Sequence, residues 1–149
     1  MNVYEIAFIL STLWVGPFWF AMMLKPHDEK TVRMMNQPFF FAGPVLIWFI
    51  TMFISPGGLS DFAAGFSDEN GFVVGLAKSL SSEAGVTALW AHMVAGDIFA
   101  TRWIWKKSIE KKINPILRNV ALFFGVMLMP LGILFYVLGL ILVKKKKKF

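Results

Sequence analysis

The sequence predicts an all-α integral membrane protein: a four-helix bundle with a short interfacial amphipathic helix between helices two and three. Of its 149 residues, 57% are hydrophobic and only 16% are charged, whereas soluble domains average about 45–50% apolar and about 25% charged residues. A core this small cannot bury the excess apolar surface, so the surrounding solvent must be apolar. The composition excludes an ordinary soluble enzyme and a disordered chain, and the lack of Cys excludes a disulfide scaffold.

Four segments have the composition of membrane spans, which need about 20 predominantly apolar residues. We expect them at residues 4–24, 39–54, 84–105 and 116–143, in a single membrane domain over residues 1–143. The first has no positively charged region before it and fits a signal peptide poorly, so we expect it to stay in the mature protein. The third is less apolar, but ionisable residues within spans are typical of functional positions.

An acidic segment, residues 57–83, separates the second and third spans. Within it, the apolar residues of 72–80 have the spacing of a short amphipathic helix lying along the membrane interface. An ordinary connecting loop is the alternative. Glu83 follows Ser81 and Ser82, and a serine cap with a carboxylate in the first turn is a common helix start.

The basic residues give conflicting evidence about orientation. With four spans, the loops at 25–38 and 106–115 share one side, which should be the cytoplasmic or stromal side because Lys and Arg favour it. The run Lys144 to Lys148, in the basic tail 144–149, then falls on the opposite side. Without this run the net charge of +6 is only +1. We therefore expect the run to bind anionic lipid rather than nucleic acid.

Three ionisable residues lie in or at the end of the third span: His92, Asp97 and Arg102. At about 100° per residue each points about 140° away from the one before it, so this helix should be central in the bundle. A charge at the bilayer centre costs at least about 2.5–3.5 kcal/mol, so Asp97 needs a partner or a proton. Interhelical hydrogen bonding and contact with a substrate or cofactor both remain open, and Arg102 could also end the span at the headgroups. No metal site is predicted, because His92 and Asp97 lack the i,i+4 spacing of two ligands.

The fourth span carries three glycines, Gly125, Gly132 and Gly139, seven residues apart on nearly one face. Small residues at this spacing allow close helix packing. Pro130 should kink the helix. A ligand groove at that kink is the alternative, which makes Pro130 a candidate contact for a substrate.

Several motifs in chain order resemble the abscisic-acid-deficient-four-like membrane proteins, whose plant members are associated with neoxanthin synthesis. The most specific series is Trp90-x-His92 followed by Asp97-x-Phe99 and Arg102. It is accompanied by Gly75 to Glu83, Pro17-Phe18, Met23 to Pro26 with Thr31, and Met129 to Ile133. The resemblance covers nearly the whole chain. It implies a small four-helix protein of the plastid envelope or thylakoid, or of a bacterial inner membrane; without a recognisable transit region, we expect a bacterial member or a mature fragment.

The resemblance also implies a reaction: isomerisation of an epoxy-carotenoid, violaxanthin to neoxanthin, or of a related apolar isoprenoid. Such a step needs an acid for the epoxide oxygen and a base for a proton, in a dry apolar slot. The candidate catalytic residues are Asp97, His92, Arg102 and Glu83, and the candidate substrate contacts are Trp90, Phe99, Trp103 and Pro130. The alternative is a non-catalytic membrane subunit or pigment or lipid binder, as a homo-oligomer or within a larger complex. The sequence does not identify a cofactor.

Overall fold

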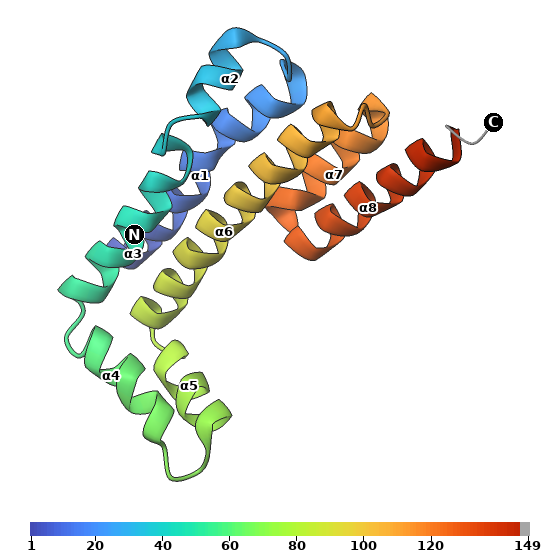
Figure 1. Cartoon of the computed structure of the whole chain (residues 1–149). Helices are drawn as coiled ribbons and strands as arrows, with labels where there is room; N and C mark the ends of the chain where they lie inside the picture. The colour runs from blue at the N-terminus through green and yellow to red at the C-terminus, as the bar shows by residue number, and fades with distance from the viewer. Residues whose placement is uncertain (147–149) are drawn as a thin grey trace. The chain divides into compact units, whose positions relative to one another are not determined.

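The computed structural model describes residues 1–146, and these residues form helices and turns without strands (Figure 1). The helices are α1 (Val3–Leu24), α2 (Glu29–Met35), α3 (Phe39–Ile54), α4 (Gly58–Ala64), the 3-10 helix η1 (Gly65–Ser67), α5 (Phe72–Leu80), α6 (Glu83–Glu110), α7 (Pro115–Met127) and α8 (Met129–Lys146). The predicted all-α class is therefore confirmed. The expected basic tail begins within α8, and its residues 147–149 lie outside the described part.

The chain divides into two compact units that share α1, α3 and α6. The first unit comprises Met1–Trp14 with Ala42–Ala95, and the second comprises Val15–Phe41 with Gly96–Phe149. The first unit thus holds the start of α1, most of α3, all of α4 and α5, and the start of α6. The second holds the rest of these long helices together with α2, α7 and α8.

Several predicted elements are present at the expected positions. Helices α1 and α3 match the first two apolar segments, and α5 occupies the predicted amphipathic segment. The third segment is helical, but α6 continues to Glu110, past its expected end at residue 105. Its start is capped as expected, because the backbone N–H of Gly85 donates to Ser82 Oγ at 3.0 Å. Two short helices, α2 and α4, were not predicted, because seven residues each are too few to show a helical period.

Two stretches among the described residues are long and apolar enough to cross a membrane, judged by length and composition alone. They are Val3–Leu24, which is α1, and Glu29–Ile54, which joins α2 and α3. The 28 residues of α6 exceed the length of a bilayer crossing, but α6 is not one of these two apolar stretches. A membrane crossing by α6 therefore stays a prediction.

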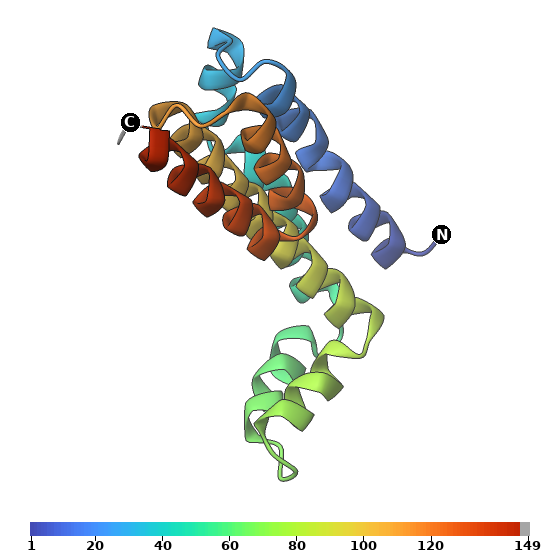
Figure 2. The ribbon, with the colours of Figure 1, turned by 90° about the vertical axis from the view of Figure 1, so that its right-hand side faces the viewer.

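The structure contradicts a continuous fourth span over residues 116–143. The chain reverses at Leu128, and α7 and α8 form an antiparallel hairpin (Figures 1 and 2). Pro130 explains the break, because it has no N–H to bond the carbonyl of Val126 and its ring would clash with that carbonyl. Leu128 takes an extended conformation (φ −154°, ψ 82°). Its N–H still donates to the Phe124 carbonyl at 2.7 Å, and its own carbonyl accepts from the Leu131 N–H at 2.9 Å.

The glycines of the former span pack helices closely, as predicted, but the partner of α8 is α7. A Cβ on Gly132 would lie 2.5 Å from the Gly125 backbone, and one on Gly139 would lie 2.8 Å from the Ile113 side chain. Gly125 itself faces Thr101 of α6. The hairpin therefore depends on the absence of side chains at these positions.

Both units have small cores in which aromatic side chains make specific contacts. In the first, Gly43 of α3 leaves room for the indole of Trp14 from α1. In the second, Trp19 Nε1 donates to the Leu122 carbonyl at 2.9 Å, and Trp105 Nε1 donates to the Pro26 carbonyl at 3.2 Å. These bonds satisfy the indole N–H groups, which otherwise carry a penalty on burial.

Replacing Gly132 by Ala tests the hairpin. We expect Gly132→Ala to destabilise the protein by about 1–3 kcal/mol, because the new methyl group meets backbone atoms that cannot move aside. The matched control is Gly96→Ala in α6, where no atom lies within 4 Å of the added Cβ, and where alanine should be neutral or stabilising by up to about 1 kcal/mol. Thermal unfolding in detergent measures both. Equal melting temperatures for Gly132→Ala and the unmodified protein would contradict the packing.

Candidate functional site

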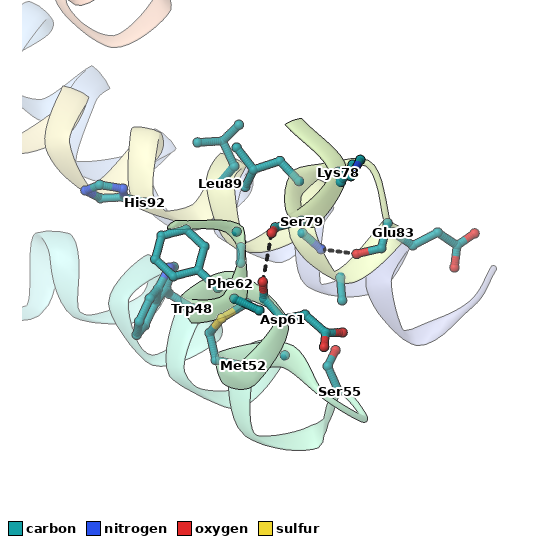
Figure 3. Close-up of a pocket in the computed structure, with 18 of the residues that line it drawn as sticks. Trp48, Met52, Ser55, Asp61, Phe62, Lys78, Ser79, Glu83, Leu89 and His92 are labelled. Carbon is teal, nitrogen blue, oxygen red and sulfur yellow. Dashed lines mark hydrogen bonds between the residues drawn. The ribbon is translucent and has the colours of Figure 1, made fainter. Parts of the chain in front are cut away.

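The first unit contains a pocket of about 1030 Å³ (Figure 3). Residues from five helices line it: Tyr4 from α1; Trp48 and Met52 from α3; Asp61 and Phe62 from α4; Lys78 and Ser79 from α5; and Glu83, Leu89 and His92 from α6. Its volume lies at the upper end of the range of about 300–1,000 Å³ for small-molecule sites. The pocket is therefore large enough for a bulky ligand.

The part of the pocket around His92 is apolar. Trp48 and Met52 come from α3, and Phe62 comes from α4; Figure 3 shows these three side chains together on the side of the pocket where His92 lies. Leu89 lies one turn before His92 on α6, so both line the same side of the helix. A single imidazole among aromatic and aliphatic side chains fits an apolar ligand that carries few polar atoms.

Two separate hydrogen bonds join helices at the polar part of the pocket. The hydroxyl groups of Tyr4 and Ser55 lie 3.1 Å apart and link α1 to the end of α3. Ser79 Oγ donates to the Asp61 carbonyl at 2.8 Å and links α5 to α4. These bonds connect α1 with the end of α3 and α5 with α4, so neighbouring elements of the pocket wall are joined in pairs.

Asp68 and Lys78 form the ion pair of this region, with Lys78 Nζ 2.7 Å from Asp68 Oδ2. The hydrogen bond from Lys78, followed by one from the Asn70 backbone, lowers the pKa of the Asp68 carboxyl. The pair ties η1 to α5 next to a close contact between Gly65 and Gly75. Asp68 and Lys78 therefore act in shaping the α4–α5 hairpin.

Glu83 lines the pocket but lies at its edge. Asn2 Nδ2 donates to its carboxylate at 3.0 Å, and the carboxylate points away from His92 in Figure 3. Glu83 also lines a second pocket of about 480 Å³ between the start of α1 and the start of α6, together with Glu5. His92, by contrast, receives no hydrogen bond or ion pair from the described residues, so its imidazole is available to a ligand.

The other two candidate catalytic residues belong to the second unit. Arg102 donates through Nε to the Met35 carbonyl and through Nη2 to Asn36 Oδ1 at 3.2 Å, and its guanidinium lies 5.5 Å from the Phe40 ring centre. These contacts cap the C-terminal end of α2 and hold it against α6. Asp97 is half-buried, and the described residues supply no hydrogen bond or ion pair to its carboxylate. Neither Arg102 nor Asp97 lines the pocket.

The four candidate substrate contacts are also dispersed. Trp90 is stacked on Phe8 at 4.6 Å and donates to Thr12 Oγ1 at 2.8 Å, which fastens α6 to α1 within the first unit. In the second unit, Phe99 contacts Phe40 and Phe41, and Trp103 contacts Tyr136. Pro130 is exposed at the hairpin turn. None of the four lines the larger pocket.

Five residues that were not predicted as site residues also line the pocket: Tyr4, Trp48, Met52, Ser55 and Phe62. One signal was available for two of them. Tyr4 begins the first apolar segment and Ser55 ends the second, and antiparallel neighbours bring such ends together. Trp48 and Phe62 could not be recognised as site residues, because in the sequence they look like the other aromatic residues of the apolar segments. Among the described residues, no three His, Cys, Asp or Glu side chains are grouped closely enough to hold a metal ion.

Comparison with known proteins identifies relatives by sequence only. The sequence profile described as ABA DEFICIENT 4-like matches residues 6–136. The protein ABA DEFICIENT 4, chloroplastic, of Arabidopsis thaliana is 27% identical over 111 residues, which is 72% of this chain and 49% of that protein. The chain therefore spans about half the length of this curated relative. No solved structure matches. Because the profile covers most of the sequence, the chain belongs to the ABA DEFICIENT 4-like family.

Proposed function

We propose that the protein is embedded in a membrane and isomerises an epoxy-carotenoid, or a related apolar isoprenoid, with one end of the ligand in the pocket of the first unit. The proposal includes α1, α3 and α6 as membrane-crossing helices, in a plastid or bacterial membrane. The single observation that supports the proposal is the pocket. It has a volume of about 1030 Å³, an aromatic lining, and the imidazole of His92, which no described residue bonds. The name of the Arabidopsis relative adds a plastid setting.

The chemistry needs one proton moved onto an epoxide oxygen and one removed from carbon, with no net change in composition. His92 is suited to one of these transfers, because an imidazole has one nitrogen that can donate a proton and one that can accept a proton. The apolar side chains of Trp48, Met52 and Phe62 would exclude water from the opened epoxide, and so prevent hydrolysis. Glu83 at the pocket edge is the carboxyl group that could complete the proton transfer after ligand binding.

A second candidate function is pigment binding without conversion. It is favoured by the orientation of the acidic groups, because Figure 3 shows the carboxylates of Asp61 and Glu83 pointing away from the His92 side of the pocket. A protein that only holds a carotenoid needs the aromatic lining and no acid–base pair. It would act as a small subunit of a larger membrane complex or as a homo-oligomer.

Pigment retention tests the location of the site. Trp48→Ala should reduce the carotenoid that copurifies with the protein at least several-fold, because the indole lines the pocket. Phe99→Ala is the matched control: it removes an exposed aromatic residue that does not line this pocket, and should leave retention unchanged. The measurement is the absorption spectrum of the purified protein from a violaxanthin-producing host. Loss of pigment in Phe99→Ala with full retention in Trp48→Ala would contradict the assignment.

Variants of the two α6 ionisable residues separate enzyme from binder. In the same host, His92→Ala should abolish neoxanthin formation while the protein still binds pigment, since the imidazole is proposed to move a proton. Asp97→Asn keeps the shape of its side chain and should leave the yield within about twofold, because Asp97 does not line the pocket. Chromatography of the host carotenoids measures both.

The possible results are distinct. Neoxanthin from the unmodified protein that disappears only in Asp97→Asn would move the chemistry out of the pocket. Pigment binding by the unmodified protein without any neoxanthin would support the binder instead of the enzyme.

A further inference from the structure

The reversal at Leu128 determines which end of the second unit Lys144 lies at. A continuous last span would carry the chain across the bilayer and place Lys144 opposite the two basic loops. In the structure, α8 instead runs back alongside α7, so the end of α8 returns toward the start of α7 (Figures 1 and 2). The lysine run and the basic loops gave conflicting evidence about orientation only because a fourth span was assumed. The structure has the α7–α8 hairpin in place of that span.

Contacts within the second unit bring three basic segments to the same end of the unit: the segment after Lys25, the segment at 106–112, and Lys144. Trp105, which precedes Lys106 and Lys107, donates to the carbonyl of Pro26, which follows Lys25. Gly139 of α8 lies against Ile113, which follows Lys111 and Lys112. Lys144 is five residues beyond Gly139, about 7.5 Å further along the helix in the direction away from the turn. In both ribbon views, α2, the α6–α7 junction and the end of α8 lie at one end of this unit.

The lengths of the two helices favour a hairpin that does not cross the bilayer. Helix α7 has 13 residues, and α8 has 15 residues before Lys144. Both are shorter than the lower end of about 17 residues for a crossing, and apolar stretches of about 10–14 residues are typical of re-entrant or buried helices. The exposed residues of the turn, Met127 and Leu128, are both apolar. The backbone N–H and carbonyl of Leu128 are paired within the hairpin, as immersion in hydrocarbon requires.

We propose that α7 and α8 form a re-entrant hairpin that enters and leaves the membrane at the same surface. The segments at 25–33 and 106–112, together with Lys144, then form one positively charged face, defined here as the basic face, against the anionic lipid headgroups of one leaflet. Of the 15 Lys and Arg residues in the sequence, Lys78 alone falls within the first unit. The inference rests on the membrane embedding of the proposed function and does not depend on the substrate.

Single cysteines test the hairpin directly, because the natural chain has none. The variants His27→Cys, Lys111→Cys and Lys144→Cys report on the three basic segments, Glu69→Cys reports on the acidic segment, and Met127→Cys reports on the turn. All five positions are exposed. Each variant is treated with a membrane-impermeant maleimide in sealed right-side-out and inside-out vesicles of the expression host.

We expect the three basic-segment cysteines to react from one side and Glu69→Cys from the other, with Met127→Cys unreactive until detergent is added. Labelling of Lys144→Cys from the same side as Glu69→Cys would overturn the hairpin and restore a fourth crossing. Ready labelling of Met127→Cys in sealed vesicles would also overturn it. Equal labelling of all five sites together with extraction by alkaline carbonate would instead contradict the membrane embedding itself.

Headgroup binding is measured on the same purified protein by thermal unfolding in mixed micelles. Phosphatidylglycerol should raise the melting temperature relative to phosphatidylcholine. This increase should shrink in the double variant Lys106→Gln/Lys111→Gln and persist in Lys78→Gln, the matched control outside the basic face. No difference between the two lipids, or an equal loss in Lys78→Gln, would refute anionic-lipid binding by the basic face.

Discussion

The contact between the backbones of Gly132 and Gly125 is the constraint on which the second unit depends. A side chain at Gly132 would meet backbone atoms 2.5 Å away, so α8 can lie against α7 only without one. Pro130 interrupts the helix, but an interruption alone allows any angle between the two parts. The glycine contact selects the antiparallel arrangement, because it lets the two helices approach along their length. The return of α8 to the level of the α6–α7 junction follows from this contact.

The first unit is organised differently, through hydrogen bonds between helix ends. Tyr4 and Ser55 join the start of α1 to the end of α3, and Asn2 joins the start of α1 to Glu83 at the start of α6. Side-chain hydrogen bonds contribute about 0.5–1.5 kcal/mol each in water. Their effect here is geometric as much as energetic, since they bring three helix ends together around the pocket. Away from those ends, the apolar faces of α1, α3 and α6 pack by complementary shape.

Much of the fold followed from apolar length and helix-start signals, which are local. The bounds of α3 and α5 and the serine cap of α6 were predictable because each depends on residues within a few positions. The hairpin was not predictable in this way. Pro130 within an apolar stretch indicates either a kink or a reversal, and the choice depends on glycine contacts between residues that are close only after folding. For the same reason, a four-span count from sequence could not take the reversal of the chain before Lys144 into account.

The candidate site was less predictable, because α6 is one continuous helix that serves two environments. His92 and Asp97 are five residues apart, about 7.5 Å along the axis and about 140° around it. The first faces the pocket among Trp48 and Phe62, while the second lies in the other unit, where no described residue bonds its carboxylate. Sequence order groups the two residues, whereas the helix turn separates them. The ionisable residues of the third apolar segment therefore identify α6 as a helix of interest, but they do not identify the site. The aromatic lining from α3 and α4 shows which ionisable residue of α6 can contact a ligand.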